Sequence, residues 1–118
     1  MNIIKALITT AILTISATAS ADPVGGRWFA DGYITPGNID SFRLTLRGEE
    51  TTAIRVSGSG SGGDIDCQLY DENANVVVQD IDSEDGCSMV VTPRWTGPFA
   101  LFIKNNGIRG SVYTARAW

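Results

Sequence analysis

Carboxylates crowd one part of this chain, the segment 64–85. Hard cations such as Ca²⁺ bind about six to eight oxygen ligands, and carboxylates placed close together repel one another unless water or a cation neutralises them. The segment therefore predicts either a calcium site or acidic turns that their charge keeps soluble. The candidate calcium ligands are Asp64, Asp66, Asp71, Asp80 and Asp82.

Two of these carboxylates fall on one face of an expected strand. Ile65, Cys67 and Leu69 alternate with polar residues, a period that predicts a strand with these three side chains pointing inward. Asp64 and Asp66 then lie together on the outer face, about 7 Å apart. That spacing suits two ligands of one cation, or two carboxylates that are simply solvated.

The chain lacks several of the residue combinations that enzymes use for catalysis, because it contains no histidine. This excludes Ser-His-Asp and Cys-His nucleophiles and the His-bearing zinc hydrolase motifs. Cys67 and Cys87 are not spaced as C-x-x-C, so a thioredoxin-type redox role is not expected. A pair of carboxylates from 64–85 could still hydrolyse a glycoside, but a small β domain has little room for a deep cleft. We therefore expect a protein without enzymatic activity.

Trp95 and Tyr70 are the candidate ligand-contact residues. Trp95 stands in a turn-like run, and two further tryptophans, Trp28 and Trp118, lie near the ends of the expected domain. Aromatic rings on a sandwich surface can act as platforms for sugar rings or apolar peptide groups, and they can equally plug the ends of a core. Spacing alone leaves both interpretations open.

Cys67 and Cys87 are the two cysteines of the chain, and we expect them to form a disulfide. An even count favours a bridge in an exported protein. A flat meander over 64–70, 76–80 and 87–92 would hold its first and third strands about 9–10 Å apart, further than the Cα atoms of a disulfide allow. Either Cys87 lies at a corner that folds over, or its strand belongs to the opposite sheet.

Residues 1–21 have the form of a cleavable secretory signal peptide. Lys5 precedes an apolar run, and Ala19-Ser20-Ala21 fits the small-x-small rule for cleavage before Asp22. The run is shorter than the ~20 residues that span a bilayer, and no later segment is apolar enough to span one. We expect a secreted or periplasmic protein with no membrane span after cleavage.

The charge balance narrows the expected partners. The chain has 13 acidic and nine basic residues, a net charge of −4, and no basic cluster. A phosphate backbone is repelled by such a surface, so we expect no nucleic-acid partner. An extracellular polymer or a protein surface is the expected partner.

Short alternating apolar runs separated by turns fill the chain after the signal, and none has helical periodicity. This pattern predicts an all-β, antiparallel two-sheet β-sandwich, jelly-roll-like, with about seven to nine strands. Neither side of the Gly/Ser-rich run 57–63 is long enough for its own core, so we expect a mobile surface loop there and a single domain over 22–118. The expected strands cover 42–46, 52–56, 64–70, 76–79, 87–91, 99–103 and 112–115.

The stretch 64–77, Asp-Ile-Asp-Cys-Gln-Leu-Tyr-Asp-Glu-Asn-Ala-Asn-Val-Val, resembles the bacterial pre-peptidase C-terminal domain. In that family an Asp-x-Asp strand ends in Leu-Tyr-Asp and leads through a turn to a Val-rich strand. Residues 95–101 look like the family's later Thr-Gly-x-Tyr strand entry, and 42–46 and 113–114 are similar to its early and closing strands.

The resemblance implies a jelly-roll-like β-sandwich of the kind usually attached to secreted proteases, sometimes calcium-binding, and implicated in binding substrate or matrix. Asp64, Asp66 and Asp71 would then be cation ligands or turn-organising residues. Two features depart from the family: the cysteine pair, and Ala74, which replaces a usual turn glycine and makes a left-handed conformation costly there.

Together these observations predict a secreted or periplasmic, non-catalytic binding or accessory module that calcium stabilises. An inhibitor or accessory partner of a secreted hydrolase is the alternative, suggested by small size, export and a disulfide. A small hydrolase using the acidic segment is a third possibility.

Overall fold

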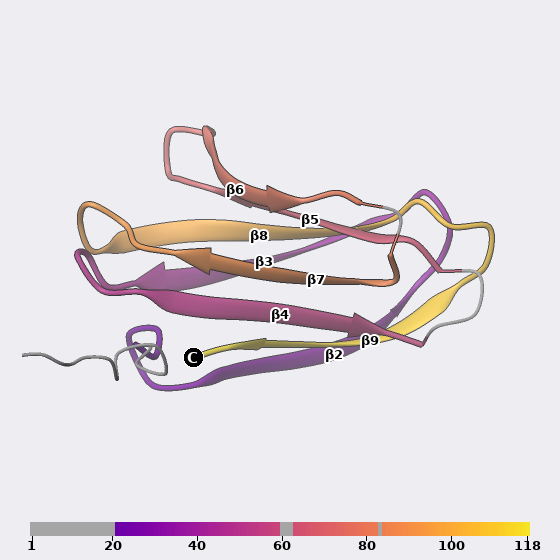
Figure 1. The fold of residues 1–118 in the computed structure, drawn as a ribbon, viewed down its shortest axis with the longest axis horizontal. Coiled ribbons are helices and arrows are strands. Elements are labelled where there is room, and N and C mark those ends of the chain that lie inside the picture. The colour runs from indigo at the N-terminus through magenta and orange to yellow at the C-terminus, as the bar shows by residue number, and fades with distance from the viewer. Residues whose placement is uncertain (1–20, 60–62, 83) are drawn as a thin grey trace, which may run out of the picture.

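The computed structural model describes residues 21–59, 63–82 and 84–118, and within them the chain forms two antiparallel four-stranded sheets packed face to face (Figure 1). The β9 sheet has the order β2-β9-β4-β7, and the β8 sheet has the order β3-β8-β5-β6. The predicted all-β sandwich is confirmed. The strands are β2 Trp28–Ile34, β3 Ile39–Leu46, β4 Thr52–Gly58, β5 Ile65–Tyr70, β6 Val76–Asp80, β7 Gly86–Val91, β8 Gly97–Asn105 and β9 Ser111–Ala117.

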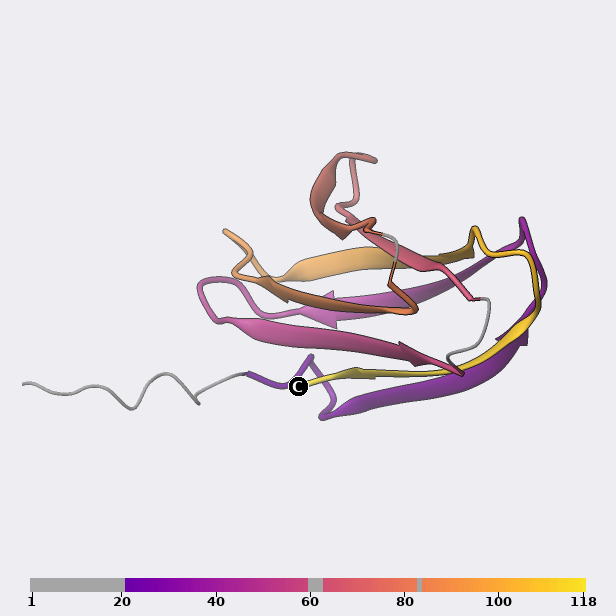
Figure 2. The ribbon, with the colours of Figure 1, turned by 45° about the vertical axis from the view of Figure 1, so that its right-hand side comes forward.

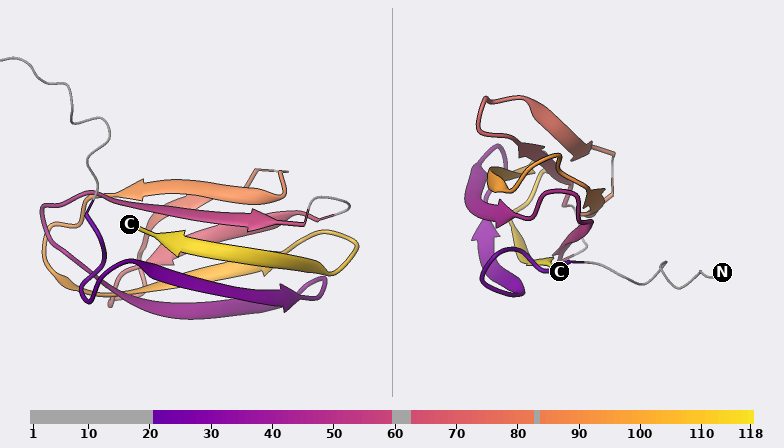
Figure 3. Two further views of the ribbon diagram at one scale, coloured as in Figure 1. Left: turned by 90° about the horizontal axis from the view of Figure 1, so that it is seen from below. Right: turned by 90° about the vertical axis from the view of Figure 1, so that its left-hand side faces the viewer.

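Most connections cross from one sheet to the other. Of the consecutive strands described, only β5 and β6 lie side by side in the same sheet, and their hairpin rises away from the rest of the sandwich (Figure 2). Seen from below, β9 lies between β2 and β4 (Figure 3). This is the crossing connectivity of a jelly-roll-like sandwich rather than that of an up-and-down meander.

The core is the shared interior of the two sheets. Alternation along each strand buries every second side chain, as in β9, where four of the seven residues are buried in strict alternation. The side chains that fill the interior are mainly aliphatic, and they include Leu46, Ile65, Leu69, Leu101 and Ile103, each 0% exposed.

β2 is the strand that the sequence did not predict. Its inward positions include Gly32, and its outward positions Phe29 and Tyr33 are aromatic and exposed, so the sequence shows no clear apolar/polar alternation there. Gly32 is required by packing, since a Cβ there would lie 2.9 Å from the hydroxyl oxygen of Tyr113. The run 57–63 also differs from expectation, because Ser57 and Gly58 belong to β4.

Two expectations fall partly outside the described residues. Residues 1–20 of the expected signal peptide and residues 60–62 of the expected surface loop are among those that the structure does not describe, as is residue 83. Cleavage before Asp22 therefore stays a prediction. Within the described part of the chain, no helix is long and apolar enough to cross a membrane.

Aromatic rings close the side of the sandwich where β2 and β3 lie. The ring centroids of Trp28 and Phe42 are 5.2 Å apart, and those of Phe42 and Tyr113 are 6.5 Å apart, both edge to face. The Tyr113 hydroxyl donates to Asp40 Oδ2 across the two sheets at 2.6 Å. Burial and the neighbouring Asp40 carboxylate raise the pKa of Tyr113, so the phenol stays protonated and continues to donate.

Asn105, fully buried at the end of β8, joins three segments of backbone. Its Nδ2 donates to the carbonyl oxygens of Ile34, at 3.0 Å, and Arg109, at 2.8 Å, while its Oδ1 accepts from the Gly107 amide at 2.8 Å. This one amide satisfies backbone groups of β2 and of the turn between β8 and β9, which water cannot easily reach.

We expect Asn105→Leu to lower the free energy of unfolding by roughly 2–4 kcal/mol, because it leaves buried carbonyl and amide groups without partners. Urea denaturation measures the loss. Asn73→Leu, at an exposed turn position, is the matched control and should change stability by less than about 0.5 kcal/mol. Equal effects of the two substitutions would contradict this role of Asn105.

Candidate functional site

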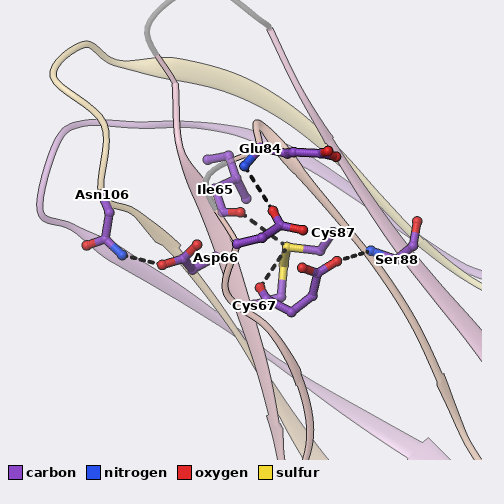
Figure 4. Close-up of a disulfide and its surroundings, with 9 residues drawn as sticks. Ile65, Asp66, Cys67, Glu84, Cys87, Ser88 and Asn106 are labelled. Carbon is purple, nitrogen blue, oxygen red and sulfur yellow. Dashed lines mark hydrogen bonds between the residues drawn. A yellow bond between two sulfur atoms is a disulfide. The ribbon is translucent and has the colours of Figure 1, made fainter.

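The Cys67–Cys87 disulfide joins β5 of the β8 sheet to β7 of the β9 sheet (Figure 4). Its Cα atoms are 6.1 Å apart and its S–S bond is 2.08 Å. Of the two arrangements that the sequence left open, the strand of Cys87 therefore belongs to the opposite sheet. Both cysteines are buried, at 0% and 3% exposure, so the bond is part of the core and not an accessible redox centre.

Asp66 lies on the outward side of β5, where a neighbouring loop reaches it. The Asn106 side chain donates to Asp66 Oδ2 (Figure 4). The Asn106 backbone amide donates to the Asp64 carbonyl oxygen at 2.8 Å. Burial raises the pKa of Asp66, the Asn106 bond opposes that rise, and the charges of Asp64 and Asp82 add to it. Asp64 and Asp66 are thus brought together, as the strand period predicted.

Each of these two carboxylates also has one oxygen that is hidden from solvent. The Oδ1 atoms of Asp64 and Asp66 are buried and lack a hydrogen-bond partner within the described part of the chain. Buried carboxylate oxygens without donors are costly, and a close second carboxylate adds repulsion. This pair is the most strained element of the acidic segment.

Asp71 organises the turn between β5 and β6. Its Oδ1 accepts backbone hydrogen bonds from Asn73, at 2.8 Å, and Asn75, at 2.9 Å, and these bonds, led by that of Asn75, hold the pKa of Asp71 below its usual value. Ala74 in the same turn has φ of 64°, the left-handed conformation that the sequence indicated would be costly without glycine.

Asp80 and Asp82 likewise bind local backbone. Asp80 Oδ2 accepts from the Ser88 amide of β7 at 2.9 Å, and Asp82 Oδ1 accepts from the Glu84 amide at 2.9 Å. Asp71 follows β5 whereas Asp64 precedes it, so these two lie at opposite ends of the strand, roughly 20 Å apart. The five candidate calcium ligands therefore do not share one site. Over 21–59, 63–82 and 84–118 no three acidic or cysteine side chains are grouped to hold a metal ion.

Tyr70 and Trp95, the candidate ligand-contact residues, lie on different surfaces. Tyr70 is on the outward face of the β8 sheet, with its ring centroid 5.0 Å from that of Phe102 and its hydroxyl donating to Gln68 at 3.0 Å. Gln68 in turn donates to Gln79 on β6 at 2.9 Å. This arrangement is an aromatic pair held by an amide network.

Trp95 instead borders an apolar groove between β6 and β7, which we call the valine groove. The groove has a volume of about 390 Å³, and the Trp95 side chain is 49% exposed. Val77 and Val90, exposed at 42% and 65%, lie on the two strands that flank it. Its lining residues are Asp71, Val77, Val78, Val90, Val91, Thr92, Pro93, Arg94, Trp95 and Phe99.

Val77 and Val90 are exposed residues that the sequence did not predict to lie on the surface. Both stand in Val-rich runs that read as strand interior, and only the structure shows that β6 and β7 are the edges of their sheets. Consecutive valines at 76–78 were the available signal, because in an ordinary half-buried strand one residue in two should be polar.

Comparison with known proteins places the fold. No family model and no curated protein matches the chain. Among solved structures it is similar to the pre-peptidase C-terminal domain of a collagenase from Bacillus anthracis, with a TM-score of 0.60 and 13% identity over 78% of this chain and 89% of that one. It is also similar to PliG of Aeromonas hydrophila, a periplasmic inhibitor of g-type lysozyme, with a TM-score of 0.56 and 9% identity over 89% of this chain and 90% of that one.

Identities this low show the fold alone. The chain therefore has a β-sandwich fold like that of pre-peptidase C-terminal domains, in agreement with the motif in residues 64–77. The same architecture also occurs in an inhibitor protein. One description names a C-terminal domain of a collagenase, and the other names an inhibitor of a lysozyme.

We expect Asp66→Asn to stabilise the protein increasingly as the pH rises from about 3 to 7 in the absence of divalent cations. The folded-state pKa of Asp66 lies above its ordinary value of 3.8, so the carboxyl stabilises the fold when protonated and this contribution is lost as the pH rises through the folded pKa. The amide removes that loss and keeps an oxygen that can accept from Asn106.

Thermal denaturation of both proteins across this pH range measures the effect. Asn106→Ala is the matched control: it deletes the donor that lowers the Asp66 pKa, so it should steepen the loss of stability of the native carboxylate with pH. If the native protein and Asp66→Asn lose stability with pH in parallel, the pKa of Asp66 is not raised in the folded protein and the prediction is wrong.

Proposed function

We propose that this chain is an exported, non-catalytic binding module whose partner is a protein held at the valine groove. The main support for this proposal is that Trp95 lies half exposed beside an apolar groove of about 390 Å³. Tryptophan is enriched among the anchors of protein interfaces, which fill apolar pockets near the interface centre.

The strand edges around the groove support a protein partner. Among the described strands, β6 pairs only with β5 and β7 only with β4, so each has an open edge on this side of the sandwich. Open edges offer backbone donors and acceptors to an extended segment of another chain. A partner strand bound there would place alternate side chains against Val77, Val90 and Trp95.

Export is supported by the buried disulfide, since such bonds persist in oxidising compartments. It is also supported by the periplasmic location stated for one structural neighbour and by the motif that resembles a domain of secreted proteases. Secreted or periplasmic location and signal cleavage are thus parts of the proposal.

Inhibition of a secreted hydrolase is the second candidate function. The observation that favours it is the similarity to the g-type lysozyme inhibitor, which covers nearly the whole of both chains. An inhibitor needs only a rigid surface that blocks an active-site cleft, so the absence of catalytic histidine in this chain is compatible with that role.

The groove is tested with the purified protein immobilised and exposed to a g-type lysozyme and, separately, to collagen. We expect one of these to be retained, and Trp95→Ala to weaken its binding by about tenfold or more, the cost of losing an interface anchor. Ile108→Ala, at an 83% exposed position outside the groove, should leave binding unchanged.

A lysozyme that is retained and also inhibited would favour the inhibitor role, and retention without inhibition would favour the accessory role. If Trp95→Ala retains the partner as well as the native protein does, the partner does not bind at the valine groove. Failure to retain either probe would count against both candidate partners.

We also propose that Ca²⁺ binds beside Asp64 and Asp66. The support is the pair of buried Oδ1 atoms without hydrogen-bond partners, together with the repulsion that Asp82 adds. A cation there would neutralise two carboxylates for which no ion pair is found among the described residues.

Adding Ca²⁺ at about millimolar concentration should then raise the melting temperature by several degrees, because a ligand that binds only the folded state stabilises it. Asp66→Asn should abolish the rise. Asp71→Asn, at the far end of β5, should keep it. If Ca²⁺ does not raise the melting temperature of the native protein, the proposed calcium site is wrong.

A further inference from the structure

A pocket of basic and aromatic side chains lies where β2 begins and β9 ends, and we call it the arginine pocket. Its volume is about 390 Å³, within the usual range of small-ligand sites. In the β9 sheet it is separated from β7 and the valine groove by β4. Its lining residues are Arg27, Trp28, Phe29, Arg116, Ala117 and Trp118.

Arg116 of this pocket lies directly opposite a second arginine, Arg55, which is not among the lining residues. Arg116 of β9 is in register with Arg55 of β4 on one side and with Phe29 of β2 on the other. Like charges directly opposite on a sheet are destabilising. Over the described residues the ion pair found is that between Arg27 and Asp22, at 3.8 Å. Arg55 lines a different pocket together with Asp80, Glu84 and Asp85, whereas no acidic side chain is among the residues that line the arginine pocket.

Aromatic rings complete the pocket. The Arg116 guanidinium lies 5.5 Å from the centroid of the Trp118 ring, and Phe29 is 61% exposed. A cation–π contact with Trp118 holds the guanidinium near the ring and still allows its N–H groups to donate to a ligand. The pocket therefore presents fixed donors for a negative group beside exposed ring surfaces.

The charge of this surface is opposite to that of the protein. The chain carries a net charge of −4, yet the outward positions of β2, β9 and β4 hold Arg55 and Arg116 against the single carboxylate of Asp31, which is in register with Thr114 rather than with either arginine. Arg27 also lines the pocket, with its charge paired to Asp22 at 3.8 Å. An anion is thus the ligand that this surface complements.

We infer that the arginine pocket binds a carboxylate-bearing sugar unit of an acidic glycan. A guanidinium matches a carboxylate with two parallel hydrogen bonds, and Trp118 and Phe29 offer ring faces on which the apolar side of a sugar can lie. An acidic peptide supplies the negative group without the flat ring, and a neutral glycan supplies the ring without the charge.

The test measures binding of oligogalacturonate to the purified protein by calorimetry and tryptophan fluorescence at low salt. We expect saturable binding that weakens as salt is added, since the arginines are exposed and their attraction is screened. Fully methyl-esterified oligogalacturonate has the same rings without the charge and should bind about tenfold or more weakly, which corresponds to the loss of one charge-assisted contact.

Arg116→Gln should weaken oligogalacturonate binding by about tenfold or more. Its melting temperature should stay equal or rise, because the repulsion with Arg55 is relieved, so a loss of binding cannot be attributed to unfolding. Arg43→Gln, on the outward face of the β8 sheet, is the matched control and should bind as the native protein does. Trp95→Ala should also bind normally, which separates this site from the valine groove.

The inference is overturned if the native protein does not bind oligogalacturonate, if the esterified form binds equally well, or if Arg116→Gln has no effect. Polyglutamate that binds as tightly as oligogalacturonate would overturn the assignment to a sugar and indicate an acidic peptide instead. Inorganic phosphate that displaces the oligosaccharide at equal concentration would indicate a phosphate ligand.

Discussion

The bond between Cys67 and Cys87 determines how one side of this sandwich is built. It fixes β5 to β7, strands of different sheets, with their Cα atoms 6.1 Å apart. At the other side of the sandwich, packed aromatic rings and the Tyr113–Asp40 hydrogen bond join the two sheets. Because one side is held covalently, β6 and β7 can leave their edges open and still keep their positions, and the valine groove depends on that freedom.

The sequence predicted the interior better than the surface. Period-2 alternation located seven of the eight described strands, and disulfide geometry required the two-layer arrangement that β7 shows. β2 was not predicted because its outward residues Phe29 and Tyr33 are aromatic and its inward residue Gly32 has no side chain. Glycine is needed at position 32 because the Tyr113 side chain packs against it. Asp64 and Asp66 were brought together as expected, but spacing along the chain could not show that Asp71 and Asp80 bind local backbone instead.

Chemically different surfaces coexist on this small fold. The outward positions of β5, with the turns that follow, carry the acidic segment, and those of β9 and β4 carry paired arginines. The inward positions determine the fold and are nearly all apolar, so the outward positions are free to differ without cost to the core. This separation explains how a collagenase domain and a lysozyme inhibitor can share one architecture with this chain at such low identity.

The last two strands of the chain occupy interior places in both sheets. β8 lies between β3 and β5, and β9 lies between β2 and β4. Neither sheet can close before residues 97–117 are available, since each would lack the strand that joins its two parts. A chain with this order stays open until its synthesis or translocation is nearly complete, and its many long-range pairings make folding slow compared with that of a helical bundle. Such a topology by itself keeps the polypeptide open until residues 97–117 have been made, without help from a chaperone.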